Sequence, residues 1–472
     1  MAQHKILFIG VGRDLAELNE IFLKAGILFH RVAPGAPLPR TERQIRMIII
    51  DLDFLAGRYS EKKIQAYLKH LRREQYRVIC IATFRDYKTL REYHEIGVND
   101  HILKPFSPRE LVLRVRAMIE RRKRVACLGG GTGLFTLLTA LKTVPGILLT
   151  SIVNMSDDGG SSGRLRSSFG VLPPGDIRRS LVALSNAPAV MNELMHYRFI
   201  RGQELEDHSV GNLLLTALSE IKGSMAEAVR SLGDILNVQG VVLPISKNLT
   251  RIVAEFEDGT VIKGESLISG GKGRALSLKI RRIWHEPEAV CEPNAYASLL
   301  HADLILIGPG DLYTSIITNL VIPEVQKALV STPARKAYIC NLMTKPGETT
   351  HFDAAEHVRS LAVSCGRDML DYVIVSNTRF SRPAVARYAK LGQHPVLAGR
   401  QGTFREMTRA KVILADVGHE TILVRHDENK LRRHIIKLLA RVRKDPVKVY
   451  TPCPRLVSPF TKRGEGDLGN LP

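Results

Sequence analysis

VACLGGGTGLFTLLTAL, residues 125 to 141, decides the fold of this chain. Its first four residues predict a buried strand, and the apolar positions of its second half recur at helical spacing. The glycines between them let backbone N–H groups approach a phosphate, and a helix N-terminus adds a partial positive charge there. Gly130, Gly131, Thr132 and Gly133 are therefore candidate ligand-binding residues. The loop is not a Walker P-loop, since no Lys-Ser/Thr pair follows, and it misses the dinucleotide fingerprint.

Four more apolar strands each lead into a small, polar loop. These loops read NMSDDGGSSGR (154–164), GPGDLYTS (308–315), NLMTKPGET (341–349) and SNT (376–378). In an open parallel sheet the loops after the strands gather at one edge, where ligands usually bind. The pattern therefore predicts an α/β domain with a mainly parallel sheet and a ligand site assembled from several loops.

Asp157 and Asp158 give the second loop its chemistry. Two adjacent carboxylates can hold Mg²⁺ or accept a proton, and the following Gly/Ser run can form an anion-binding nest. Residues 159 to 163 also match G-x-S-x-G, the motif of a hydrolase nucleophile. Ser161 lies too far beyond its strand for a nucleophile elbow, so the context argues against a hydrolase. A solvated Asp/Gly turn is an equally good interpretation of this loop taken alone.

Further segments complete the set of candidates. PPGDIR (173–178) precedes a helix from Ile177 to Leu184, and we expect Asp176 to be an ordinary N-cap. HSVGN (208–212) opens another helix, where His208 either caps the helix or contacts a ligand. Residues 250 to 268 alternate around Glu-Asp-Gly-Thr, which predicts a β-hairpin near the pocket or on an oligomer surface. His351 and His357 fit helix-surface positions better than a metal site.

The first 122 residues predict a separate, smaller α/β domain. Apolar strands are expected at residues 5–9, 47–50, 77–81 and 100–103, and helices at 15–25, before residue 97 and at 108–122. This alternation indicates a parallel, doubly wound sheet of the flavodoxin type. Asp51 ends one strand and Lys104-Pro105 ends another. The domain resembles a response-regulator receiver, with Asp51 at the phosphoacceptor position.

The receiver chemistry is expected to be degenerate. Aspartyl phosphorylation needs a divalent metal, which receivers bind with an acidic pair just after the first strand. Gly10-Val11-Gly12 occupies that place. The hydroxyl position that receivers have at a later strand end falls on Ala82, with Thr83 one residue late. An interaction or dimerisation module is the better interpretation, and we expect a homo-oligomer.

Composition indicates the cellular setting. At 472 residues with 44% apolar content, the chain can bury at least two cores, and no apolar run is long enough to span a membrane. The N-terminus lacks the pattern of a signal peptide, so we expect a cytoplasmic protein. The six scattered cysteines predict reduced, mostly buried thiols.

The net charge of +21 lies in the flanks. Through Arg124 there are 25 basic against 14 acidic residues, residues 125–420 have 31 against 28, and the remainder has 12 against 5. A basic surface attracts any polyanion, but no aromatic-interleaved basic motif marks a specific nucleic-acid binder. We expect the helix from Leu431 to Val442 to pack beside the central domain, and residues 443–472 to form a basic tail, disordered from about Thr451.

The motifs GGGTG, SDDGGSSGRL, PPGDIR, HSVGN, GPGDLYTS and NLMTKPGET, in this order, resemble the CofD/YvcK family, and more closely its gluconeogenesis-factor branch. The resemblance implies a Rossmann-like three-layer domain over residues 123–442. Relatives of 2-phospho-L-lactate transferase move a phosphorylated three-carbon acid from a guanylyl carrier to a deazaflavin. The gluconeogenesis-factor branch is associated with UDP-sugars, notably UDP-N-acetylglucosamine, and with carbon metabolism, cell wall synthesis and cell shape.

The resemblance also implies roles for single residues. Asn154, Asp157 and Asp158 would organise a metal or polar groups at the centre of the site, and Mg²⁺ is the candidate cofactor. Arg387 stands where the family carries an arginine whose guanidinium suits a diphosphate, although a surface helix arginine is as good an interpretation. The other candidate ligand-binding residues are Ser161, Ser162, Asn212, Gly308, Gly310, Tyr313, Thr314, Ser315, Asn341, Thr344 and Asn377.

Three functions remain open. The favoured hypothesis is a cytoplasmic UDP-sugar-binding regulator whose receiver-like domain couples ligand state to a regulatory or cell wall protein, or to self-association. The first alternative is a transferase acting on a nucleotide-linked phospho-acid, in which Asp157 and Asp158 would be catalytic through Mg²⁺. The second is a basic scaffold with a vestigial pocket. We expect neither a specific nucleic-acid partner nor a membrane span.

Overall fold

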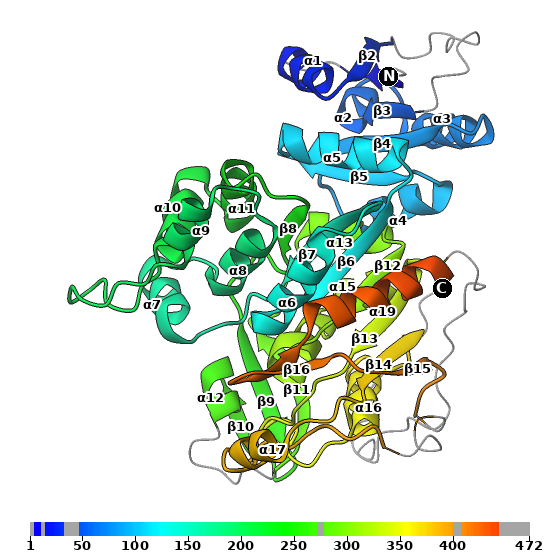
Figure 1. Ribbon diagram of the computed structural model, residues 1–472. Coiled ribbons are helices and arrows are strands. Elements are labelled where there is room, and N and C mark those ends of the chain that lie inside the picture. The colour runs from blue at the N-terminus through cyan, green and yellow to red at the C-terminus, as the bar shows by residue number, and fades with distance from the viewer. Residues whose placement is uncertain are drawn as a thin grey trace.

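Two parallel sheets, each accompanied by helices, organise the chain (Figure 1). The computed structural model describes residues 4–10, 15–32, 47–270, 278–399, 404 and 407–442. The α/β architecture predicted from the strand, loop and helix pattern is confirmed. Of the helices in the described ranges, none has both the length and the apolar character that a membrane crossing requires.

The N-terminal unit is built on a five-stranded parallel sheet in the order β2-β1-β3-β4-β5, the flavodoxin-like order that receivers share. The predicted doubly wound sheet is confirmed. One strand, β2, was not predicted, because it is a short edge strand that ends in polar residues. The elements are β1 (His4–Ile9), α1 (Leu15–Lys24), β2 (Ile27–Arg31), β3 (Met47–Asp51), α2 (Leu52–Ala56), α3 (Glu61–Arg73), β4 (Arg77–Thr83), α4 (Tyr87–Ile96), β5 (Asp100–Lys104) and α5 (Pro108–Ile119).

The central sheet has seven parallel strands in the order β15-β14-β13-β12-β6-β7-β8. The chain starts at β6, builds one side first and then returns to build the other, so the direction of winding reverses between β6 and β12. Such a switch point leaves a crevice outside the carboxyl ends of two strands, where open α/β sheets bind ligands. The strands are β6 (Lys123–Gly129), β7 (Ile147–Val153), β8 (Val241–Pro244), β12 (Leu304–Ile307), β13 (Arg335–Ile339), β14 (Tyr372–Ser376) and β15 (Lys411–Ala415).

The helices of the central domain connect these strands. The last of them, α19, packs against α6, so the predicted position of the C-terminal helix beside this domain is confirmed. The helices are α6 (Gly131–Lys142), α7 (Gly160–Phe169), α8 (Gly175–Leu184), α9 (Ala189–His196), α10 (Val210–Lys222), α11 (Met225–Ile235), α13 (Pro293–Leu300), η1 (Leu312–Ile317, a π-helix), α14 (Thr318–Leu320), α15 (Pro323–Ser331), α16 (Ala354–Ser364), α17 (Arg382–Ala389) and α19 (Glu428–Arg441).

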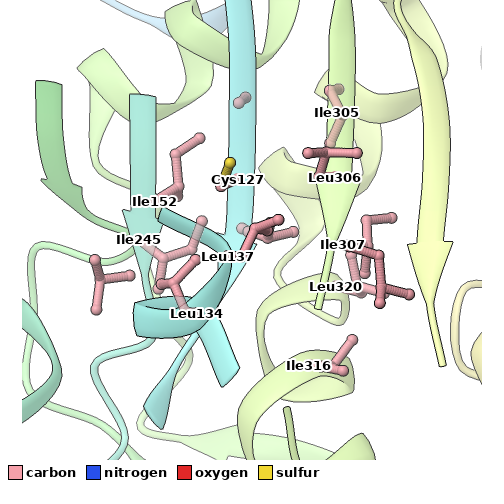
Figure 2. Close-up of a cluster of buried hydrophobic side chains, with 14 of the residues drawn as sticks. Cys127, Leu134, Leu137, Ile152, Ile245, Ile305, Leu306, Ile307, Ile316 and Leu320 are labelled. Carbon is pink, nitrogen blue, oxygen red and sulfur yellow. The ribbon is translucent and has the colours of Figure 1, made fainter. Parts of the chain in front are cut away.

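The core beneath the switch point is aliphatic. Cys127 of β6, Ile152 of β7 and Ile305 of β12 come from three adjacent strands, and Leu134 and Leu137 of α6 lie close to them (Figure 2). A parallel sheet buried on both faces needs such runs of apolar residues. Burying one leucine side chain contributes roughly 2 kcal/mol. This packing fixes the strand ends from which the polar loops depart.

An antiparallel sheet of order β10-β9-β11 is inserted between β8 and α13. The predicted hairpin is confirmed as β9 (Arg251–Phe256) and β10 (Val261–Lys263), with Thr260 N donating to Asp258 Oδ1 at 2.9 Å in the turn. Helix α12 (Glu265–Gly270) follows, and β11 (Ile280–Glu286) completes the sheet. A small hairpin of β16 (Gly418–Glu420) and β17 (Val424–His426) precedes α19. The predicted tail, 443–472, lies outside the described residues.

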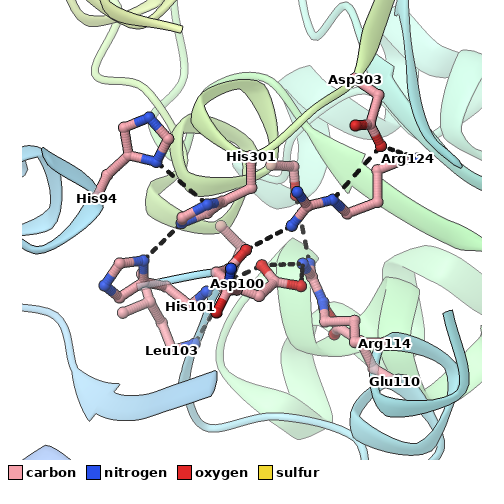
Figure 3. Close-up of polar contacts among 12 residues, drawn as sticks. His94, Asp100, His101, Leu103, Glu110, Arg114, Arg124, His301 and Asp303 are labelled. Carbon is pink, nitrogen blue, oxygen red and sulfur yellow. Dashed lines mark hydrogen bonds and ion pairs between the residues drawn. The ribbon is translucent and has the colours of Figure 1, made fainter. Parts of the chain in front are cut away.

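The two units meet through a buried polar interface (Figure 3). His301, just after α13, lies between two histidines of the N-terminal unit. Its Nε2 is 2.7 Å from His101 Nδ1 on β5, and its Nδ1 is 3.3 Å from His94 Nδ1 on α4. Arg114 of α5 donates to Ser298 Oγ of α13 at 3.3 Å. The N-terminal unit therefore presents β5, α4 and α5 to the central domain.

Five of the six cysteines are free, buried thiols, as predicted: Cys80, Cys127, Cys291, Cys340 and Cys365. Burial raises the pKa of Cys365 to about 12, so this thiol stays protonated and unreactive. Cys453 lies outside the described residues.

Candidate functional site

The loops after β6 and β12 touch at the switch point. A Cβ built on Gly133 would lie 2.2 Å from the carbonyl oxygen of Pro309. A Cβ on Gly130 would lie 2.6 Å from Asp176 Oδ2, and Gly131 has a φ of 64°, in the left-handed region. At Gly133 a side chain would displace the neighbouring loop and at Gly130 it would displace the Asp176 carboxylate, whereas at Gly131 the positive φ favours glycine. The glycines therefore serve the packing of the loops in addition to any role toward a ligand.

Asp176 ties the first loop to α8. Its Oδ2 accepts a hydrogen bond from Gly131 N at 2.7 Å, and its Oδ1 accepts one from Arg179 Nη1 at 3.1 Å. Burial raises the pKa of this carboxyl to about 6; the Arg179 guanidinium opposes the rise and the Asp157 carboxylate adds to it. The prediction that Asp176 is an N-cap is wrong, because Pro174 holds that position and the Asp176 carboxylate reaches the glycine loop instead.

Asn154 ties the second loop to the third. Its buried side chain follows β7 directly, and its Nδ2 donates to Thr314 O at 3.0 Å, while its Oδ1 accepts from Ser156 Oγ at 2.9 Å. Its backbone N–H donates to Gly129 O at 2.8 Å. The predicted residues Asn154 and Thr314 therefore lie together at the switch point. The side chain of Asn154 joins the loops after β7 and β12, and its backbone N–H joins them to the end of β6.

Asp157 and Asp158 have different partners. Asp157 Oδ1 accepts from Gly159 N at 3.0 Å. Asp158 Oδ1 accepts from Ser266 N at 2.8 Å and from Ser266 Oγ at 2.6 Å, which fastens α12 to the loop. Within the described ranges, no three His, Cys, Asp or Glu side chains are placed to hold a metal ion. Mg²⁺ binding by this pair stays a prediction.

Acidic side chains crowd the site under α12. Glu265 Oε2 is buried and has no hydrogen-bond partner among the residues that the structure describes. Burial raises the pKa of Glu265 well above its usual value, and repulsion from Asp157, Asp176 and Glu348 raises it further. Carboxyl groups this close keep a proton or need a cation between them. The local sequence gave no sign of Glu265, because only the inserted sheet brings it here.

Lys345 places a cation beside α12. Its Nζ lies 3.0 Å from Glu348 Oε1 and 3.1 Å from Ser269 Oγ, and it also pairs with Asp311. Glu348 in turn accepts a hydrogen bond from Thr314 Oγ1 at 3.0 Å. Burial opposes ionisation of Glu348, but the attraction of Lys345 outweighs it and holds the pKa of that carboxyl below its usual value. Neither residue of this pair was a predicted site residue, although both stand in the NLMTKPGET motif.

Ser161 belongs to a buried hydrogen-bond chain. Its Oγ lies 3.0 Å from His208 Nδ1 and accepts from Asn212 Nδ2 at 3.1 Å. Arg164 Nε donates to His208 Nε2 at 3.1 Å, so the ring proton is on Nδ1 and points to Ser161. His208 is therefore no base for Ser161, which argues against a Ser-His hydrolase. The capping residue of α10 is Ser209, whose hydroxyl accepts from Asn212 N.

Several other predicted residues lie at the same edge. Asn341 Nδ2 donates to Gly310 O at 2.7 Å, which joins the loops after β12 and β13. Ser162 is buried beside Gly175, whose added Cβ would lie 2.4 Å from the Ser162 hydroxyl oxygen. Ser315 is buried in η1, and Gly308 and Gly310 flank Pro309 in the loop before it.

Three predicted residues either bond to other parts of the protein or are exposed to solvent. The Tyr313 hydroxyl donates to Ser360 Oγ at 3.1 Å, so the phenol is directed toward α16. Thr344 Oγ1 accepts from His394 N at 2.9 Å. Thr132 is exposed at the start of α6. Tyr313 and Thr344 therefore support the walls through bonds to the protein.

Asn377 and Arg387 are exposed on the β14 side of the sheet. Asn377 N donates to Ala415 O at 3.0 Å, and the Arg387 guanidinium lies 5.9 Å from the ring centre of Tyr388. Within the described ranges, neither residue contacts the loops of the switch point. The surface interpretation of His357 is wrong, because this residue is fully buried in α16.

A second acidic cluster lies at the edge of the N-terminal sheet. Lys104 Nζ bridges Asp51 Oδ2 at 2.8 Å and Asp53 Oδ2 at 3.0 Å, and Thr83 Oγ1 donates to Asp53 Oδ2 at 2.9 Å. Thr83 is the last residue of β4, so the placement of Ala82 at the strand end is wrong. Residues 11 and 12, in the predicted metal position, lie outside the described residues.

Comparison with known proteins concerns the central domain. Residues 125–417 match the family described as 2-phospho-L-lactate transferase CofD. The gluconeogenesis factor of Bacillus subtilis is 38% identical over 323 residues, which cover 68% of this chain and 99% of that protein. The gluconeogenesis factor of Listeria monocytogenes is 42% identical over 260 residues, or 55% and 79% of the two chains. A crystal structure of a UPF0052 family member from Bacillus halodurans aligns with a TM-score of 0.64 at 38% identity, covering 67% of this chain and 99% of that chain.

Proposed function

Because the chain belongs to the family of 2-phospho-L-lactate transferase CofD and is similar to gluconeogenesis factors, we propose that it is a cytoplasmic regulator that binds a UDP-sugar of the UDP-N-acetylglucosamine type. The ligand occupies the crevice between β6 and β12. Through a regulatory or cell wall protein, the ligand state acts on carbon metabolism, cell wall synthesis and cell shape.

One observation carries the proposal: two buried side chains join the loops of three adjacent strands at the switch point. Asp176 holds the glycine loop after β6, and Asn154 joins the loop after β7 to the loop after β12. Loops fixed in this way present backbone N–H groups without further ordering, which lowers the cost of binding. The geometry supports a phosphorylated ligand, and the choice of a UDP-sugar rests on the resemblance to the gluconeogenesis-factor branch.

The charges of the site favour binding of the ligand together with a cation. Asp157, Asp176 and Glu265 repel one another, and a diphosphate beside them would add to that repulsion. A divalent cation placed among these carboxylates would remove it, and Mg²⁺ suits oxygen ligands and phosphates. Asp158 is occupied by Ser266, so in this arrangement Asp157 is the more available of the two predicted metal ligands.

Isothermal titration calorimetry with UDP-N-acetylglucosamine and with GDP, with and without Mg²⁺, tests the proposal. We expect saturable binding of the UDP-sugar, weakened at least tenfold in Asn154→Ala, since the side-chain bond that joins the loops after β7 and β12 is lost (about 1.4 kcal/mol or more). Asn429→Ala, on the exposed start of α19, is the matched control and should bind like the unmodified chain. If no UDP-sugar gives a saturable heat of binding, the proposal is wrong.

A transferase is the second candidate, because the matching family is described by that activity. In this case Asp157 would hold Mg²⁺ at the phosphate that is transferred from the nucleotide carrier. Incubation with a guanylyl-linked phospho-acid and a deazaflavin distinguishes the two functions. Transfer activity that is lost in Asp157→Asn would show that the protein is a transferase. Binding of a UDP-sugar without any transfer would support the regulatory function.

A further inference from the structure

Two buried polar atoms near the second loop have no hydrogen-bond partner among the residues that the structure describes. One is Oε2 of Glu265, the first residue of α12, and the other is Nη1 of Arg166 on α7. Buried polar groups in folded proteins are almost always hydrogen-bonded, so each exception needs an explanation. An acceptor and a donor are both left open in this part of the molecule.

The two open groups lie close to the same carboxylate. Burial raises the pKa of Glu265, and repulsion from Asp157 adds to the rise. Burial and the Arg251 guanidinium lower the pKa of Arg166, and the attraction of Asp158 and Asp157 opposes the change. Because Asp157 acts on both side chains, a single bound group can reach both of them.

Helix α12 holds Glu265 in a fixed position. Ser266 donates to Asp158 Oδ1 through its backbone N at 2.8 Å and through its Oγ at 2.6 Å. Ser269 Oγ donates to Glu348 Oε1 at 2.9 Å. Glu265 therefore stands at the start of a helix that is bonded to two different loops, and its carboxyl group can bind without further ordering.

The charges around Glu265 disfavour a phosphate at this place. Asp157, Asp176 and Glu348 surround its carboxyl group with negative charge, and Lys345, which opposes them, is already paired with Glu348. A phosphate would add to this negative charge, whereas an uncharged group would not. The phosphates of a ligand are therefore expected nearer the N-terminus of α6, whose partial positive charge attracts them.

An open acceptor beside an open donor selects the chemical class of the bound group. A phosphate accepts from Arg166 but leaves Glu265 without a donor. A metal ion binds Glu265 but leaves Arg166 without an acceptor. A hydroxyl group both donates and accepts, so a ring with several hydroxyl groups satisfies Glu265 and Arg166 together.

We infer that Glu265 and Arg166 bind the sugar of the ligand, with Glu265 Oε2 accepting a hydrogen bond from one hydroxyl group and Arg166 Nη1 donating to another. The inference rests on the proposed function and sets the direction of the ligand, whose sugar lies beside α12 and whose diphosphate lies toward the N-terminus of α6. A site that bonds to hydroxyl groups discriminates against a ligand that lacks them. These two residues therefore determine the affinity for the sugar and leave the affinity for the free nucleotide unchanged.

Calorimetric titration of the full chain with UDP-N-acetylglucosamine and with UDP, each with and without Mg²⁺, tests the inference. Glu265→Ala should weaken binding of the UDP-sugar roughly tenfold and change that of UDP by less than about twofold. Arg166→Ala should act in the same way. Retained binding of UDP shows that each variant is folded. Glu288→Ala is the matched control, because Glu288 is exposed beyond the end of β11, and it should bind both ligands like the unmodified chain.

The other outcomes separate this inference from the proposed function. Equal weakening of UDP and the UDP-sugar in Glu265→Ala, or no change in either, overturns the sugar contact while the binding function stands. Loss of the Mg²⁺ dependence for both ligands in Glu265→Ala would make this residue a metal ligand and would also overturn the inference. If the unmodified chain binds UDP but no UDP-sugar, the proposed function and the sugar contact are both wrong.

Discussion

His101 Nδ1 lies 2.7 Å from His301 Nε2, and this contact joins β5 of the N-terminal unit to the end of α13. One of the two facing nitrogens must donate and the other accept, so the accepting ring has to be neutral, and protonation of both rings would break the contact. Burial lowers the pKa of His101 to about 4, and it lowers the pKa of His301 well below its usual value. Arg114 and His94 add to both effects, while Asp100 opposes the first.

Acid should therefore weaken the contact between the two units. The pKa of His101 in the folded chain lies below its value of about 6.5 in an unfolded chain, so its contribution is complete above about pH 6.5 and is lost as the pH falls toward 4. The loss amounts to about 3 kcal/mol at most. Calorimetric unfolding from pH 7 to pH 4.5 measures it. In His101→Phe the acid-induced fall should be smaller, and an equal fall would assign it to other groups.

Much of the ligand site follows from the sequence, because a polar loop after an apolar strand has a known place in a parallel sheet. What the sequence does not give is the partner of each side chain. Asp176 looks like a cap when only its own helix is considered, whereas its nearest donor, Gly131, is 45 residues away. Glu265 reaches the site only because the inserted sheet carries α12 there. The end of β4 was predicted one residue too early, at Ala82 in place of Thr83, because an apolar run does not mark where a strand ends.

The pKa of Asp176 predicts how UDP-N-acetylglucosamine binding depends on pH. Its diphosphate has no proton to lose between pH 5.5 and 7.5, so the dependence reports on the protein. Because the pKa of Asp176 is about 6, its carboxylate takes up a proton as the pH falls from 7.5 to 5.5, and it then no longer repels the ligand. In the absence of Mg²⁺ the affinity should rise roughly threefold to tenfold from pH 7.5 to 5.5. Titrations of Asp176→Asn should show a smaller slope than the unmodified chain, and an equal slope would exclude Asp176 as the cause.

Gly133→Ala should damage the site through the backbone. The added Cβ would meet Pro309 O at 2.2 Å, and a carbonyl oxygen in a packed loop cannot rotate away as a side chain does. Overpacking of this kind costs about 1–3 kcal/mol, so the unfolding temperature should fall by roughly 5 °C. Gly57→Ala is the control, because its Cβ would have no neighbour closer than 3.8 Å. Equal unfolding temperatures for the two variants would contradict the close packing of the loops.

Asp51 should not be phosphorylated to a measurable extent. Lys104 pairs with both Asp51 and Asp53, and the acidic pair that receivers use for metal is replaced by Gly10-Val11-Gly12 in the sequence. Incubation with acetyl phosphate and Mg²⁺, followed by intact-mass measurement, should give no more product than Asp51→Asn gives. Strong labelling of Asp51 that the asparagine variant lacks would show that this unit is a working receiver.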